Sequence, residues 1–236
     1  MVLTDDNFAT IVAAVREGRG IYANIQKAVQ FLLSCNLGEI LTVFFALLFW
    51  HVSPLASIHL LFVNLVTDSL PALALGMEPV EDDVMLQKPR RAKESIFAHG
   101  VGVWTALQGL LIGGLTLLAF KMGKDLGGDD MGTTMALAVL SLSQLVHAFN
   151  VRSNRSLFSA GWFKNRFMLL AFPLSLAATL AVLLFPPMRE LFSTTAHPLV
   201  ALPAAAWWDI AGLAIAPLVV MEVIKGIIAL VKRLRK

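Results

Sequence analysis

Apolar residues in this chain fall into six long blocks that are separated by shorter polar segments. Each block is roughly 17–23 residues long, about the length that an α-helix needs to cross the hydrocarbon core of a bilayer. The pattern predicts an all-α membrane protein, a bundle of six transmembrane helices. The predicted spans lie at about residues 29–50, 58–75, 100–120, 133–149, 167–185 and 208–231.

A more polar segment precedes the first apolar block. From Phe8 onward, apolar residues such as Ile11, Val15 and Ile25 recur at helical spacing with charged residues between them. We expect a cytoplasmic amphipathic stalk helix here that continues into the first span, so that one helix runs from Phe8 to Trp50. At ~1.5 Å per residue this helix would be on the order of 65 Å long, which exceeds the thickness of a bilayer. Its first part is therefore expected to project into the cytoplasm.

The composition and the placement of charge agree with a membrane protein. Hydrophobic residues make up 57% of the chain and charged residues 15%, whereas soluble domains average about a quarter charged residues. Of the 19 Lys and Arg residues, 16 lie in segments that the six spans place on one side of the bilayer. The positive-inside rule then predicts that both termini are cytoplasmic. We expect a lipid bilayer around the chain, the plasma membrane if the source is bacterial, and no nucleic-acid partner.

Polar side chains occur inside the first two spans at spacings that group them. Asn36 and Glu39 are three residues apart, and Asn64, Thr67 and Asp68 have the spacing i, i+3 and i+4. Each set therefore lies on one face of its helix. A short loop joins the two spans, so we expect antiparallel neighbours whose polar faces meet. Intramembrane carboxylates are costly unless they face protein or water, which makes them functional candidates.

The chemistry of these five side chains favours a hard cation. They offer carboxylate, amide and hydroxyl oxygens, and calcium takes six to eight oxygen ligands, whereas zinc favours His or Cys. Two buried acids with no buried basic partner repel one another unless they are protonated or share a cation. The pattern therefore predicts a site that exchanges protons for a divalent metal ion. For Asn36, Asn64 and Thr67 the alternative is that they only form hydrogen bonds between helices.

Three other features of the spans lead to expectations. Pro71 cannot donate a helical hydrogen bond and its ring crowds the carbonyl of Thr67, so the second span should be kinked or partly unwound beside Asp68. On the fourth span Gln144 and His147 form a polar stripe, in which we interpret His147 as an interfacial histidine rather than a ligand. We expect close helix packing at three glycines of the third span, Gly109, Gly113 and Gly114.

These residues resemble the P-type calcium ATPases of the sarcoplasmic reticulum type. The resemblance is carried by four segments, Ile21-Tyr22-Ala23-Asn24-Ile25, Asn36-Leu37-Gly38-Glu39, Asn64-Leu65-Val66-Thr67-Asp68 and Lys88-Pro89-Arg90. The opening residues 1–8 are similar to the last strand of that family's phosphorylation domain. The resemblance implies that residues 1–28 are the end of the phosphorylation domain with the stalk helix. Residues 29–236 would be a six-helix cation-transport domain, helices five to ten of a pump.

The resemblance also assigns ligands to the transported ion. It implies that calcium is the cargo and that its ligands are Asn36, Glu39, Asn64, Thr67 and Asp68. In calcium pumps that carry two ions, a Glu of helix eight stands where the nearest match here is Gln144. We include Gln144 as a sixth candidate metal ligand, and the sequence leaves the number of ions per cycle open at one or two.

By this likeness the chain is the C-terminal transmembrane part of an ATP-driven calcium pump, a translocase. The family's phosphorylated Asp-Lys-Thr-Gly-Thr loop has no counterpart in these residues, and no GxxxxGK[ST] loop is present. We expect that this chain alone does not hydrolyse ATP, and that ATP and magnesium act only through an N-terminal half of the pump as partner. Two alternatives stay open: a stand-alone six-helix cation channel or cation/proton exchanger, and a non-catalytic membrane fragment.

Overall fold

A computed structural model describes residues 8–81, 83–86, 89, 93–153, 157, 161 and 163–234 of the chain. Six of its helical segments are long and apolar enough to cross a membrane, and the described residues contain no β-strand. These segments are Phe8–Trp50, Ser57–Gly76, Val101–Gly127, Asp129–Val151, Arg166–Leu184 and Ala204–Val231. The predicted all-α bundle of six spans is confirmed. The resemblance to a phosphorylation-domain strand falls on residues 1–8, of which 1–7 lie outside the described residues, as do Lys88 and Arg90.

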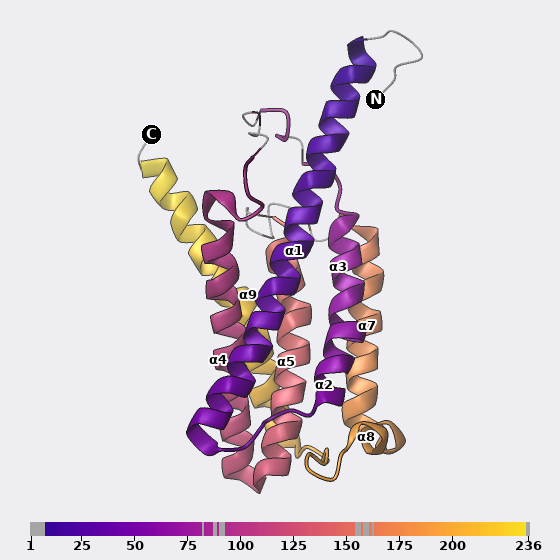
Figure 1. Ribbon diagram of the computed structural model, residues 1–236, viewed down its shortest axis with the longest axis vertical. Coiled ribbons are helices and arrows are strands. Elements are labelled where there is room, and N and C mark those ends of the chain that lie inside the picture. Colours follow the sequence, from indigo (N-terminus) through magenta and orange to yellow (C-terminus); the bar gives the residue numbers. More distant parts are fainter. Residues whose placement is uncertain are drawn as a thin grey trace.

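The first helix, α1, runs without interruption from Phe8 to Trp50 over 43 residues. The prediction of one continuous helix is confirmed, and Figure 1 shows that its N-terminal part extends beyond all the other helices. Its buried positions recur at intervals of three, four or seven residues, for example Gly20, Asn24 and Phe31. One face of α1 therefore packs along the bundle, as expected for an amphipathic helix that continues into a span.

The second span consists of three helical segments in continuous succession: α2 (Ser57–Phe62), the π-helical segment η1 (Val63–Asp68) and α3 (Ser69–Gly76). The predicted irregularity beside Asp68 is present, but the helix widens into π turns and does not unwind. Pro71 has no N–H for the carbonyl of Thr67, so the regular ladder cannot continue through this point. The hydroxyl of Ser69 donates to the carbonyl oxygen of Asn64 at 2.9 Å, which satisfies a backbone acceptor of the widened segment.

Helix α4 (Val101–Gly127) packs closely against α1. A Cβ atom added to Gly113 would lie 2.9 Å from the carbonyl oxygen of Gly38, and one added to Gly109 would lie 2.9 Å from the side chain of Leu37. The expectation of close packing is confirmed at these two glycines. It is wrong for Gly114, where a Cβ atom would meet nothing within 4 Å.

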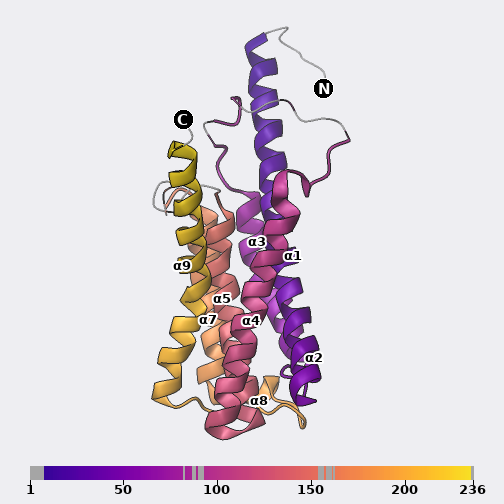
Figure 2. The same cartoon turned by 90° about the vertical axis from the view of Figure 1, so that its left-hand side faces the viewer.

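Helix α5 (Asp129–Val151) is the central element of the bundle. It contacts α1, η1, α3, α4, α7 and α9, and 83% of its most apolar stretch is buried. Figures 1 and 2 both show it inside the ring of other helices. Leu137 and Leu140 of α5 join Phe62 and Phe120 in one apolar core. Because α5 is covered on nearly every side, its polar side chains depend on neighbouring helices for hydrogen bonds.

The outer part of the bundle is formed by α7 (Arg166–Leu184), the short α8 (Pro186–Phe192) and α9 (Ala204–Leu234). Only 17% of the most apolar stretch of α9 is buried, so most of its surface is free to face lipid. Helix α8 was not predicted, because Pro186 and Pro187 mark the end of an apolar block. Proline is accepted in the first turn of a helix, where N–H groups have no partner within the helix. The first turn of α1 and the last turn of α9 lie at the same end of the bundle (Figure 2).

We predict that Gly113→Ala lowers the free energy of unfolding by about 1–3 kcal/mol, because the added methyl group would be forced against the backbone of Gly38. Gly114→Ala is the matched control: it is on the same helix and has open space around it, so it is expected to leave stability unchanged or raise it by up to about 1 kcal/mol. Thermal unfolding of the two variants in detergent tests this. Equal stability of the two would contradict close contact of α1 and α4 at Gly113.

Candidate cation-binding site

Five of the six predicted ligands come together where α1, η1 and α5 meet, in the buried middle of the bundle. Glu39 is on α1, Gln144 is on α5, and η1 carries the other three. We call this group the oxygen cluster: Glu39, Asn64, Thr67, Asp68 and Gln144. The spacing of Asn64, Thr67 and Asp68 puts them together on η1, and the short loop after α1 brings the second span beside α1.

Glu39 is the centre of the hydrogen bonds in the oxygen cluster. Its carboxylate is 5% exposed, and each of its oxygens accepts a hydrogen bond from an amide nitrogen of another helical segment. Nδ2 of Asn64 donates to Oε2 at 2.8 Å, and Nε2 of Gln144 donates to Oε1 at 3.2 Å. Glu39 therefore links α1 to η1 and to α5, and neutral donors, not a basic side chain, stabilise its carboxylate.

Asp68 has the opposite environment. It is fully buried, with 0% exposure, and neither carboxylate oxygen accepts a hydrogen bond from a nitrogen or oxygen donor in the described part of the chain. The buried thiol of Cys35 lies beside it, and the carboxylate of Glu39 is close enough to repel it. A buried carboxylate without a nitrogen or oxygen donor is strongly destabilising, which makes Asp68 a candidate functional residue.

Two other oxygens of the cluster come from Thr67 and Gln144. The hydroxyl of Thr67 donates to the carbonyl of Val63 at 2.7 Å, which leaves the lone pairs of its oxygen available. The carbonyl oxygen Oε1 of Gln144 is buried and has no hydrogen-bond partner among the described residues. The unpaired buried acceptors of Asp68 and Gln144 thus come from η1 and α5, two segments that pack against each other.

The sixth predicted ligand, Asn36, is not joined to the cluster in this way. It is only partly buried, and its Nδ2 donates to the carbonyl of Leu32 one turn earlier in the same helix at 2.8 Å. Asn36 and Glu39 therefore belong to the same helix at the predicted spacing, but the hydrogen bond of Asn36 does not connect it to Glu39.

The donor set of the cluster consists of oxygen atoms. Within the described residues, no group of three or more His, Cys, Asp and Glu side chains that could hold a metal ion lies together. The two carboxylates of the cluster are accompanied by amides and a hydroxyl, which suit a hard cation such as calcium.

The interpretation of His147 as an interfacial residue is wrong. It is buried in the bundle, with Nε2 3.0 Å from the hydroxyl of Ser34 and its ring stacked on Phe31. Both partners belong to α1, so the histidine is covered because α1 and α5 cross at this level. The sequence of α5 contains no signal for this, since burial depends on which helix lies opposite.

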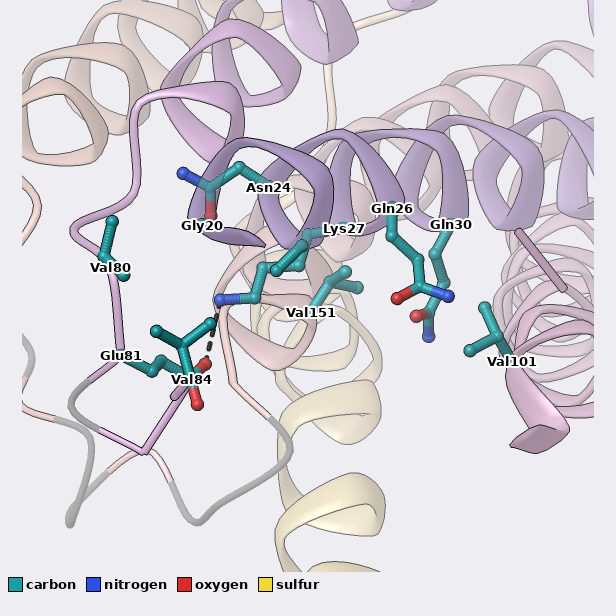
Figure 3. A pocket seen from close by; sticks show the side chains of 11 residues that line it. Gly20, Asn24, Gln26, Lys27, Gln30, Val80, Glu81, Val84, Val101 and Val151 are labelled. Carbon is teal, nitrogen blue, oxygen red and sulfur yellow. Dashed lines mark hydrogen bonds and ion pairs between the residues drawn. The ribbon is translucent and has the colours of Figure 1, made fainter. Parts of the chain in front are cut away.

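A pocket lies on the side of α1 nearer its N-terminus and is separate from the oxygen cluster. It has a volume of about 130 Å³ and is lined by α1, the segment after α3, the start of α4 and the last residue of α5. Figure 3 shows Lys27 of α1 reaching across to Glu81, and their ion pair is 2.9 Å long. On the same side, Arg19 donates to the carbonyl of Val84 at 3.0 Å. These contacts tie the stalk part of α1 to the segment that follows the second span.

Sequence reasoning missed a second buried polar group near this end of the bundle, formed by Glu78, Arg152 and Asn165. Arg152 was counted only as a positive charge in a loop, and Glu78 only as part of a polar segment. The one local signal is Asn165, which stands as an N-cap directly before an apolar block.

Comparison with known proteins gives the family. Residues 52–227 match the family described as cation transporting ATPase, C-terminus. The chain belongs to this family. The matched residues include four members of the oxygen cluster, while Glu39 precedes them in α1.

The relatives of this cation-transporting ATPase region are much longer proteins. The chain is 44% identical to a Bacillus cereus protein named calcium-transporting ATPase 1, over 95% of the chain and 27% of the relative. It is 43% identical to the calcium-transporting ATPase of Bacillus subtilis, over 92% of the chain and 24% of the relative. It is 33% identical to human calcium-transporting ATPase type 2C member 1, over 82% of the chain and 21% of the relative. The chain therefore spans about a quarter of the length of these relatives.

We predict opposite effects on stability for neutral isosteres of the two acids. Asp68→Asn removes a buried charge that has no partner, so the free energy of unfolding without divalent cations should rise by about 1 kcal/mol. Glu39→Gln places an amide group where two donors point, so it should lower that free energy by about 1–2 kcal/mol. Thermal unfolding in the presence of a chelator measures both. A loss of stability in Asp68→Asn equal to that in Glu39→Gln would contradict an unpaired Asp68.

Proposed function

We propose that this chain is the cation-transport part of an ATP-driven calcium pump and that the oxygen cluster binds the transported calcium ion. The observation that carries the proposal is the buried carboxylate of Asp68, which has no nitrogen or oxygen hydrogen-bond donor in the described structure and lies close enough to the carboxylate of Glu39 to be repelled by it. A divalent cation between Asp68 and Glu39 would neutralise both charges. The names of the relatives, which are calcium-transporting ATPases, support calcium as this cation.

The proposed ligands are Asn36, Glu39, Asn64, Thr67, Asp68 and Gln144. The free oxygens of Asp68 and Gln144 are available without rearrangement. The amide of Asn64 now donates its nitrogen to Glu39, so rotation of this side chain would turn its oxygen toward the ion. Calcium tolerates irregular sets of six to eight oxygens and water molecules can complete the shell, which fits a site assembled from three helical segments.

The proposed orientation connects the oxygen cluster to the rest of the pump. The Lys and Arg residues predict that the first turn of α1 and the last turn of α9 face the cytoplasm. The stalk part of α1 would then project toward an N-terminal half of the pump, where ATP and magnesium act. Movement of the stalk would reach Glu39 directly, because one unbroken helix contains both. Protons would replace calcium on the two acids after its release.

Replacing the unpaired carboxylate in the complete pump tests the proposal. We predict that Asp68→Asn raises the calcium concentration for half-maximal ATP hydrolysis by at least about 100-fold, because the principal charged ligand is lost. Asp130→Asn is the control, since Asp130 is an exposed acid in the first turn of α5, away from the cluster. The measurements are calcium-dependent ATP hydrolysis and uptake of radioactive calcium into vesicles.

An unchanged calcium requirement in Asp68→Asn would contradict the ligand assignment. Calcium flux through liposomes that contain this chain alone, without ATP, would instead favour a channel or a cation/proton exchanger. A complete protein that hydrolyses ATP in response to another cation but not to calcium would contradict the proposed cargo.

A further inference from the structure

Arg152 forms a buried ion pair at the end of α5. It is 2% exposed, its Nε donates to both carboxylate oxygens of Glu78 at 3.2 and 3.1 Å, and its Nη2 donates to Oε1 at 2.9 Å. The guanidinium also lies 5.8 Å from the ring centre of Phe149. Burying two charges costs free energy, and geometry this specific fixes the relative position of the two backbones.

Asn165 connects the same carboxylate to a third helix. Its side-chain oxygen accepts from the backbone N–H of Met168 at 3.0 Å, so it caps the N-terminus of α7. Its Nδ2 donates to the carbonyl of Ala74 in α3 at 2.8 Å and to Oε2 of Glu78 at 2.6 Å. One side chain thus binds the start of α7 both to the last turn of α3 and to Glu78.

The backbone of Glu78 is bound by the stalk part of α1. Nδ2 of Asn24 in α1 donates to the carbonyl oxygen of Glu78 at 2.6 Å. Glu78 is therefore bound by α1 through its main chain, and by α5 and α7 through its side chain. We call these four residues the Glu78 joint: Asn24, Glu78, Arg152 and Asn165.

The Glu78 joint lies at one end of the helices that carry the oxygen cluster. Asp68 precedes Gly76, the last residue of α3, by eight residues, about 12 Å along the helix at ~1.5 Å per residue, and Glu78 follows Gly76 by two residues. Gln144 precedes Arg152 by eight residues, about 12 Å along α5. Two helical segments of similar length therefore connect the joint to Asp68 and to Gln144. The joint thereby sets the position of Asp68 relative to Gln144 along the bundle axis.

Fixing the end of α3 matters because the π-helical segment η1 could change its winding. A π turn contains an extra residue, so its return to α-helical winding would rotate each following residue by about 100° and shift it along the axis. Such a change in η1 would turn Asp68 away from Glu39 unless the end of α3 is fixed. The buried ion pair and the two hydrogen bonds of Asn165 supply that fixed end.

We propose that Glu78, Arg152 and Asn165 are positioning residues for cation binding, which hold α3 in the winding and height that keep Asp68 in the oxygen cluster. This rests on the proposed function, because the cluster is taken to be the calcium site. The residues touch no ion themselves. They act on affinity through the placement of Asp68, and the bond from Asn24 connects the same point to the stalk.

Three variants of the complete pump test the proposal: Glu78→Gln, Arg152→Gln and Asn165→Ser. Serine keeps an oxygen that can cap α7 but lacks the amide that binds Ala74 and Glu78, so Asn165→Ser removes these two hydrogen bonds of the joint with least damage to folding. We expect the calcium concentration for half-maximal ATP hydrolysis to rise about tenfold in each, with the maximal rate within about twofold of the parent. Lys124→Gln is the control, because it breaks the partly exposed ion pair with Asp129 between α4 and α5 at the other end of the bundle.

An unchanged calcium requirement in Asn165→Ser would overturn the proposal, and so would a lower unfolding temperature as the sole effect in all three variants. If Glu78→Gln and Arg152→Gln fail to fold, Asn165→Ser decides alone. Lys124→Gln should leave the calcium requirement within about twofold of the parent. A tenfold change in this control would show that any ion pair has the effect, and would also overturn the proposal.

Hydrogen exchange separates this inference from the proposed function. In cation-free protein, backbone amides of residues 63–76 should exchange at least about threefold faster in Asn165→Ser than in the parent, because the end of α3 is released. This measurement requires no transport activity. A complete protein without calcium-dependent ATP hydrolysis would contradict the proposed function, whereas equal exchange rates would contradict the positioning role of the joint.

Discussion

The carboxylates of Glu39 and Asp68 lie together in the buried middle of the bundle, and in the described part of the chain neither forms an ion pair with Lys or Arg. In a medium of low dielectric constant this arrangement raises the energy of the cation-free protein. The amide groups of Asn64 and Gln144 donate hydrogen bonds to Glu39 and so offset part of this cost. Of the two acids, Asp68 has no such amide donor in the described part of the chain, which is compatible with the proposed cation site.

The oxygen cluster and the Glu78 joint differ in how their polar atoms are paired. The oxygen cluster contains unpaired acceptors, which makes it receptive to an ion but poorly fixed by its own hydrogen bonds. The Glu78 joint has the opposite character, because its charges are fully paired and its amide binds two partners at once. A receptive site and a fixed anchor on the same two helices are compatible with reversible ion binding, since only the site itself has to change when an ion enters or leaves.

Local patterns in the sequence were sufficient for part of the site. The i, i+3 and i+4 spacing of Asn64, Thr67 and Asp68 and the short loop between the first two spans already predict that acids of both spans face each other. Gln144 required the resemblance to a known family, because nothing in α5 alone shows which helix lies opposite. Asn36 is spaced to share a helix face with Glu39, yet its amide donates to the carbonyl oxygen of Leu32 in the same helix. Which acceptor an amide binds depends on distances between atoms, and residue spacing does not contain these distances.

The sequence by itself determined the six spans, the single long helix from Phe8 to Trp50 and the irregular winding next to Pro71, because these follow from apolar length and from the covalent geometry of proline. Only the tertiary structure decided that this irregularity is a π segment, that His147 is buried, and that Arg152 and Asn165 meet Glu78. The physical reason is the range of the interactions. Hydrophobic length and backbone geometry act within one segment, whereas burial and side-chain pairing depend on which surfaces of separate helices come into contact.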